Sequence, residues 1–190
     1  NGGFIYVFDV KTQKSRKVSI QIANDINHGR DTEKDAAKNI QSVDISPDGE
    51  RLVLSARGDV FTVPAESGIT RNITKTSGIH ERNAVWSPDG KYIAYISDKT
   101  GEFEIYIQSQ DGTKEAVQLT KEADTYYFGI SWSPDSKHIM WNDKKMRLRY
   151  VNVDTKAVVE IAQSNIWEYS QYVWSPDSKW ISYVESEENG

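Results

Sequence analysis

A four-residue turn motif recurs through this chain at intervals of about forty residues, and it limits the possible folds more than any other feature. Its four copies are Ser46–Gly49, Ser87–Gly90, Ser133–Ser136 and Ser175–Ser178. Large apolar residues repeat in register with it. At the position two before each proline stand Ile45, Trp86, Trp132 and Trp174. At the position five after it stand Leu52, Ile93, Ile139 and Ile181. The chain is therefore a tandem array of one structural unit.

The motif has the chemistry of a tight hairpin turn. Ser accepts hydrogen bonds at the first position, Pro presets φ at the second, Asp suits the third, and Gly takes a left-handed conformation at the fourth. Ser136 and Ser178 replace that glycine. We expect these two hairpins either to hold a left-handed serine, at a cost of about 1 kcal/mol, or to use a different turn.

Each repeat contains four short apolar segments separated by turn residues, which predicts four antiparallel strands. The second segment, for example Tyr92–Ile96, is apolar on both faces, as in a sheet covered on both sides. The fourth segments are shorter or more polar, which suits an outer edge. Four-stranded units of about forty residues that stack face to face predict an all-β fold, a β-propeller of four-stranded antiparallel blades.

The phase of the repeat predicts three complete blades and two half-blades in one propeller segment. We expect strands three and four of a blade in residues 1–23, a polar inter-blade loop in 24–39, blades in 40–78, 79–121 and 122–163, and strands one and two of a blade in 164–187. The half-blades could pair to close a four-bladed ring, the segment could belong to a larger propeller, or two copies could associate through open edges. Rings of four blades are at the lower limit of propellers, which favours the larger propeller.

Composition excludes several classes of protein. The net charge is −5 with both signs interspersed, which argues against a nucleic-acid-binding surface. The chain has no Cys, so disulfides and thiolate metal sites are excluded. No apolar run reaches the length of a membrane span, and the first residues lack the features of a signal peptide. The residues leave the compartment open between an oxidising periplasm and a reducing cytoplasm.

The segment from Trp86 to Tyr95, Trp-Ser-Pro-Asp-Gly-Lys-Tyr-Ile-Ala-Tyr, resembles the WD40-like repeat of TolB, prolyl oligopeptidase and tricorn propellers. Residues 1–6, 54–64 and 70–82 look like the N-terminal propeller of tricorn-like S41 serine peptidases. This resemblance runs over nearly the whole chain. No residue matches the catalytic Ser and His motifs of that family.

The resemblance implies a noncatalytic propeller that scaffolds or gates peptide access to a separate catalytic region, accompanied by a PDZ-like region, in a tricorn-like serine protease. The parent chain would then be a hydrolase, its partners would be peptides and these regions of the same chain, and the bacterial periplasm would be favoured. The alternative is a TolB-like scaffold for protein–protein interaction with no protease attached. A third possibility is a propeller hydrolase with its site in the central channel, but the sequence shows no cluster of carboxylates and histidines for it.

Eight residues near the predicted starts of first strands are candidates for contact with a peptide or partner. Aromatic side chains bring large contact area with little entropy to lose, and the polar neighbours can orient a ligand. The competing interpretation is packing between blades. The candidates are His80, Glu81, Arg82, Tyr126, Tyr127, Trp167, Glu168 and Tyr169.

We predict no catalytic residue, cofactor or metal in this segment. The three histidines, His28, His80 and His138, are far apart and lack paired metal spacing or a nucleophile motif. His138 lies at a packing position of the repeat. The repeated aspartates stand singly among turn residues, unlike the alternating carboxylates of a calcium loop. Phosphate-binding glycine motifs are absent from the sequence.

Overall fold

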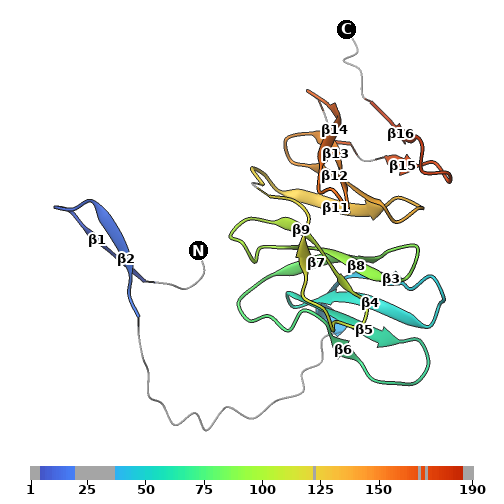
Figure 1. Cartoon of the computed structure of the whole chain (residues 1–190), viewed down its shortest axis with the longest axis horizontal. Helices are drawn as coiled ribbons and strands as arrows, with labels where there is room; N and C mark the ends of the chain where they lie inside the picture. The colour runs from blue at the N-terminus through green and yellow to red at the C-terminus, as the bar shows by residue number, and fades with distance from the viewer. Residues whose placement is uncertain (1–4, 20–36, 122, 167, 170, 186–190) are drawn as a thin grey trace. The chain divides into compact units, whose positions relative to one another are not determined.

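The structure is a computed structural model that describes residues 5–19, 37–121, 123–166, 168–169 and 171–185. The chain divides into two compact units, residues 1–35 and 36–190, and each is described by itself. Figure 1 shows the second unit as a series of antiparallel sheets. The prediction of an all-β fold with four-stranded antiparallel blades is confirmed.

Three four-stranded sheets follow one another along the second unit. The first blade has β3 (Ile40–Ile45), β4 (Arg51–Ala56), β5 (Asp59–Pro64) and β6 (Arg71–Asn72). The second blade has β7 (Glu81–Trp86), β8 (Tyr92–Ser97), β9 (Glu104–Ser109) and β10 (Val117–Gln118). The third blade has β11 (Tyr127–Trp132), β12 (His138–Asp143), β13 (Arg147–Asn152) and β14 (Val158–Gln163). Each sheet is ordered as it runs in sequence, as consecutive hairpins require.

Two-stranded hairpins account for the other strands. The N-terminal hairpin, in the first unit, pairs β1 (Tyr6–Asp9) with β2 (Lys14–Lys17). The C-terminal hairpin pairs β15 (Tyr172–Trp174) with β16 (Ile181–Tyr183). The predicted polar loop lies outside the described residues as far as residue 36, and its last three residues form a short 3₁₀ helix, η1 (Ala37–Asn39).

All four Ser-Pro-Asp motifs form the same turn, whichever residue ends it. In the first, the Ser46 hydroxyl donates to Asp48 Oδ1 at 2.5 Å and accepts from the Arg51 N–H at 2.9 Å. Gly90 takes φ 72°, and Ser136 and Ser178 both take φ 59°. The serines therefore hold the left-handed conformation, and the different turn is the wrong alternative.

The tryptophans that precede the turns occupy equivalent places in the sheets. Trp86 pairs with Ile93, Trp132 with Ile139 and Trp174 with Ile181. Trp86 and Trp132 are 6% and 9% exposed, whereas Trp174 is half-buried. The repeat register of the sequence is therefore present in the sheets, with Trp86 and Trp132 buried and Trp174 half-buried.

The hydrophobic core lies between successive sheets rather than inside one layer. One cluster joins the first and second blades, one joins the second and third, and one joins the third to the C-terminal hairpin. Both faces of β8 and β12 are therefore buried, which explains their continuous apolar sequences. The inner strands β3 and β7 contact each other, as do β7 and β11.

Apolar side chains are exposed at both ends of this series. On β3, Val43 and Ile45 are 58% and 56% exposed, and in the C-terminal hairpin Val173 is 62% exposed. A blade face of this composition is normally covered by another blade. A larger propeller, a four-bladed ring and association of two copies would each cover these faces, and the choice among them stays a prediction.

In the described residues, no helix has the length and apolarity to cross a membrane.

Candidate functional site

The antiparallel blades place their connections at two opposite ends of each sheet. The Ser-Pro-Asp turns lie at one end, together with the turns between third and fourth strands; we name this the turn end. The loops between second and third strands lie at the other, together with the segments that lead into the next blade; we name this the loop end. The sequence candidates that the structure describes lie at the start of a first strand or just before one, hence at the loop end.

An aromatic–arginine cluster occupies the loop end between the second and third blades. The ring of Phe103 lies edge to face with His80 at 6.0 Å and with Tyr126 at 5.9 Å between centroids. Tyr126 meets Phe128 in the same manner at 5.5 Å. The Arg82 guanidinium carbon lies 4.7 Å from the Phe103 ring centroid and 4.1 Å from that of Tyr126. The structure therefore brings three sequence candidates together around one phenylalanine.

Arg82 holds the two blades together at this cluster. Its side chain is 5% exposed, and it donates to the backbone carbonyls of Tyr127 at 2.6 Å and Phe128 at 3.1 Å. Burial lowers the pKa of the Arg82 guanidinium. None of the described carboxylates forms an ion pair with it, so carbonyl dipoles and two ring faces compensate its charge.

A shallow hollow of about 380 Å³ lies beside this cluster and is lined by Phe103, Tyr126 and Asp124 among others. Tyr126 is 42% exposed, so one aromatic ring is open to a ligand. Asp124 is held by Lys145 and Arg147, each at 2.6 Å. Hydrogen bonds from Arg147 and then Lys145 hold the pKa of Asp124 far below its usual range, so the rim carries fixed charges of both signs.

Two of the predicted contact residues have their side chains inside the protein. Glu81 is buried and accepts from the Thr76 hydroxyl at 2.8 and 2.9 Å, and burial raises its pKa. Tyr127 is buried with its ring 5.3 Å from that of Trp141, and burial raises its pKa to about 12. These side chains are engaged in packing, and only the Tyr127 carbonyl takes part in the cluster.

The remaining candidates lie next to the C-terminal hairpin. Glu168 is exposed, and Trp167 lies outside the described residues. Tyr169 is buried, and its carbonyl accepts from the Asn142 side chain at 2.7 Å. The structure does not bring Glu168 and Tyr169 together with the aromatic–arginine cluster, and the predicted role of all three residues in ligand contact stays a prediction.

Sequence reasoning missed Phe103 and Asp124. Phe103 ends the loop between β8 and β9, and an aromatic residue directly after Gly101-Glu102 was the available signal. Asp124 precedes Tyr126 in a segment whose predicted contact residues were all aromatic. Both belong to the loop end, so attention to all loop-end connections would have found them.

The cluster has the chemistry of a binding surface. It offers ring faces, an imidazole and fixed charges, which suit stacking and hydrogen bonding with an extended ligand. Within the described ranges, no group of three or more His, Asp or Glu residues could hold a metal ion.

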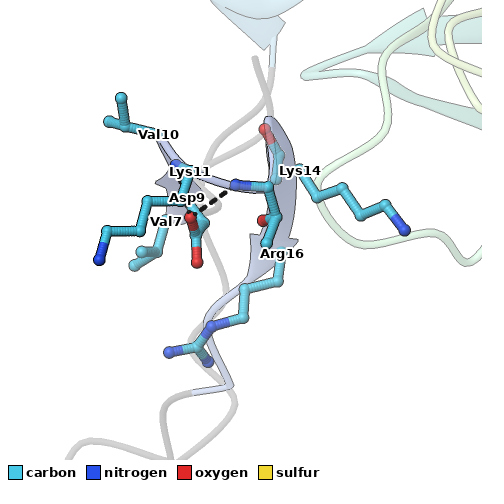
Figure 2. Close-up of a pocket in the computed structure, with 8 residues that line it drawn as sticks. Val7, Asp9, Val10, Lys11, Lys14 and Arg16 are labelled. Carbon is cyan, nitrogen blue, oxygen red and sulfur yellow. Dashed lines mark hydrogen bonds between the residues drawn. The ribbon is translucent and has the colours of Figure 1, made fainter.

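A further hollow of about 510 Å³ lies on the N-terminal hairpin and is shown in Figure 2. The Asp9 carboxylate accepts from the N–H groups of Lys11 and Thr12, at 2.8 and 3.0 Å, and thereby shapes the hairpin turn. These backbone hydrogen bonds lower the Asp9 pKa. All residues that line the hollow are exposed, and it contains no convergent set of polar groups, so we do not take it as the site.

Curated proteins similar to this chain are longer than it. The uncharacterized protein Atu1656 of Agrobacterium fabrum is 30% identical over 128 residues, which cover 63% of this chain and 42% of that protein. Dipeptidyl-peptidase 5 of Porphyromonas gingivalis is 29% identical over 143 residues, which cover 65% of this chain and 21% of that protein. The chain thus spans less than half the length of these relatives.

Solved structures show the same fold. The crystal structure of the tricorn protease matches with a TM-score of 0.71 and 18% identity, covering 100% of this chain and 18% of that one. TolB from Acinetobacter baumannii matches with a TM-score of 0.62 and 20% identity, covering 97% of this chain and 43% of that one. At these identities the matches establish the propeller fold alone.

A family model gives the narrower assignment. The model described as the tricorn protease second beta propeller domain matches residues 40–190, which include the three complete blades and the C-terminal hairpin. The match therefore covers most of the chain and every repeat of the turn motif. The chain belongs to the family of the tricorn protease second β-propeller domain.

Proposed function

We propose that this chain is a noncatalytic propeller domain that scaffolds or gates peptide access to the catalytic region of a tricorn-like serine protease. The observation that carries the proposal is the aromatic–arginine cluster at the loop end of a tricorn-type propeller. Its open ring, Tyr126, lies beside a hollow bordered by charged side chains. Such a surface fits an extended peptide, whose backbone can hydrogen-bond while its side chains stack.

The similarity of Dipeptidyl-peptidase 5, which is named as a peptidase, supports a peptidase as the parent protein. This chain covers only a fifth of that relative, so the active site and any PDZ-like region would belong to other parts of the parent. The proposed task of this segment is to position peptides.

Peptide binding to the purified 190-residue chain tests the proposal. A fluorescent library of unstructured ten-residue peptides should bind weakly, and mass spectrometry should find the peptides uncleaved. Tyr126→Ala should weaken binding by about fivefold to tenfold, because the lost ring supplies stacking worth roughly 1 kcal/mol. Tyr6→Ala is the matched control, since Tyr6 is also an exposed tyrosine and lies in the other unit.

Three outcomes would contradict the proposal. Cleavage of the peptides by this chain would show that the segment is catalytic. Equal binding by the Tyr126 variant and the parent chain would remove the cluster from peptide contact. Capture of a folded protein partner without any peptide binding would support the alternative, a TolB-like interaction scaffold.

A further inference from the structure

Another concave region lies at the turn end, between the first and second blades. Its cavity of about 240 Å³ is lined by Arg51 and Arg71 of the first blade and by Trp86, Gly90 and Gln110 of the second. It lies at the opposite end of the sheets from the aromatic–arginine cluster. Its lining is mainly polar, with two guanidinium groups from β4 and β6, the strands on either side of β5.

Two residues that line the cavity each carry a buried hydrogen-bond donor without an acceptor. Arg51 Nη2 donates to the carbonyls of Thr62 and Ile69 and to the Thr62 hydroxyl, at 3.0 to 3.1 Å. Arg51 Nε is buried without a hydrogen bond, and so is the indole Nε1 of Trp86, a residue only 6% exposed. Buried donors without partners are costly, so this pair calls for an acceptor that the described residues do not supply.

The two arginines also lack counter-ions. Neither Arg51 nor Arg71 forms an ion pair within the described residues. Burial and then the nearby charge of Arg71 lower the Arg51 pKa, so the two cations repel each other. An anion between them would relieve this repulsion and accept from their free N–H groups.

Carboxylates at the edge of the cavity limit the charge of such an anion. Asp48 and Glu50 also line the cavity, and Asp48 Oδ1 is engaged by the Ser46 hydroxyl and the Glu50 N–H. Hydrogen bonds from these groups lower the Asp48 pKa, so Asp48 is ionised at neutral pH. A singly charged planar carboxylate would suffer less repulsion from them than a doubly charged phosphate.

The other two blade junctions lack these arginines. In register, Tyr92 and His138 occupy the place of Arg51, and Val117 and Val159 occupy the place of Arg71. His138 packs its ring against Trp174, 5.7 Å away. The indole N–H groups of Trp132 and Trp174 also lack a hydrogen-bond partner, as does that of Trp86. The arginine pair is therefore what distinguishes the first junction.

We infer that the cavity at the turn end, between Arg51, Arg71 and Trp86, binds a carboxylate group. The source is a small carboxylic acid, a peptide C-terminus or an acidic side chain, all of which present the same planar anion. The two guanidinium groups hold its charge, the Gln110 amide can donate to its oxygens, and Trp86 lines the same cavity. This inference does not depend on peptide gating at the loop end.

Nuclear magnetic resonance of the ¹⁵N-labelled full chain provides a direct test. The six tryptophans give six indole N–H signals, and Trp86→Phe identifies the relevant one. Titration with N-acetylglycine, which carries a terminal carboxylate, should shift the Trp86 signal with a dissociation constant of about 1–10 mM, a weak single-site affinity. N-acetylaspartic acid α-amide tests a side-chain carboxylate, inorganic phosphate tests the dianion, and N-acetylglycinamide is the neutral control.

Two variants with equal changes in net charge complete the experiment. Arg71 is exposed and makes no hydrogen bond through its side chain in the described structure, so Arg71→Gln should fold normally and weaken the carboxylate response about tenfold. Arg149→Gln breaks a surface pair with Glu160 and should leave the response unchanged.

Each negative result would overturn the inference. The first is a Trp86 signal that does not move at about 50 mM carboxylate, a concentration well above the expected dissociation constant. The second is an equal shift with N-acetylglycinamide, and the third is an unchanged dissociation constant for the carboxylate in Arg71→Gln. Tighter binding of phosphate than of either carboxylate would overturn the assignment to carboxylates.

Discussion

The first blade junction and the two that follow share one repeat register but differ in the polar contacts that join the blades. At the first, backbone N–H groups of the second blade donate to side chains of the first: Trp86 to Asp44 at 2.8 Å and Ala84 to Ser55 at 3.0 Å. At the second, the Arg82 side chain donates to backbone carbonyls of the third blade. At both junctions a side chain of the preceding blade meets the backbone of the next blade, but the donor is the backbone at the first junction and the side chain at the second.

The turn ends of the junctions differ in a second polar contact. The Ser136 hydroxyl accepts from the Asp89 N–H of the preceding blade at 3.0 Å, and the Ser178 hydroxyl accepts from the Asp135 N–H at 3.0 Å. At the first junction Gly90 occupies that position and offers no hydroxyl. A serine in the glycine position thus gains an inter-blade hydrogen bond that offsets its backbone strain. The two turns that have serine in place of glycine are therefore the two whose last residue forms a hydrogen bond between blades.

The largest expected effect comes from removing the arginine that joins the second and third blades. Arg82→Met keeps much of the side-chain volume but loses the hydrogen bonds to the Tyr127 and Phe128 carbonyls and the contacts with two rings. We expect a loss of about 3 kcal/mol in the free energy of unfolding, measured by urea denaturation.

Arg149→Met is the matched control for this change. Arg149 pairs with Glu160, whose side chain is 44% exposed, so the loss should stay below about 0.5 kcal/mol. Equal losses for the two variants would show that the Arg82 contacts do not join the blades.

A pH-dependent effect should separate Glu81 from the turn-end aspartates. Burial raises the pKa of Glu81, so the folded state binds more protons than the unfolded state above the ordinary value of 4.5. The contribution of this carboxyl to stability is therefore lost as the pH rises from 4.5 through the raised pKa of the folded state. Hydrogen bonds lower the pKa of Asp48 and Asp177, and their contributions have the opposite sign.

Glu81→Gln isolates the first contribution, because glutamine carries no titrating proton. The melting temperature of the variant minus that of the parent chain should rise as the pH increases above 4.5, the ordinary pKa of this carboxyl, as linkage requires. Melting curves at several pH values measure this difference. A difference that is constant across the range would contradict the raised pKa of Glu81.

The sequence predicted the blades because their determinants are local. Ser-Pro-Asp turns and paired apolar positions such as Trp132 and Ile139 lie within a few residues of each other, so their spacing reveals the strands. The candidate site depended on contacts between distant segments. Phe103 meets His80 and Tyr126 across about twenty residues on each side, and only the folded arrangement of loops creates that cluster.

The serine turns provide a smaller and more specific test. Ser136→Ala keeps the left-handed conformation at φ 59° but loses the hydrogen bond from Asp89, so it should cost about 0.5–1 kcal/mol. Ser136→Gly loses the same hydrogen bond and relieves the backbone strain, so its net effect should be within about 0.5 kcal/mol of zero. A glycine variant that is less stable than the alanine variant would contradict this account.

The smallest expected effect comes from introducing the missing hydroxyl at the first junction. Gly90→Ser adds a side chain whose Cβ would meet only Pro47 Cδ, at 3.9 Å, so the space accepts it. The left-handed conformation at φ 72° costs roughly 1 kcal/mol, and a new hydrogen bond from the Asp48 N–H should offset most of it. Urea denaturation should give a change within about 0.5 kcal/mol, the same balance that Ser136 maintains. Because Gly90 also lines the cavity at the turn end, the hydroxymethyl group should reduce the shift of the Trp86 signal on carboxylate addition although stability is kept. A loss above about 2 kcal/mol would mean that the serine cannot reach Asp48, and that the first junction differs from the others in backbone position as well as in side chains.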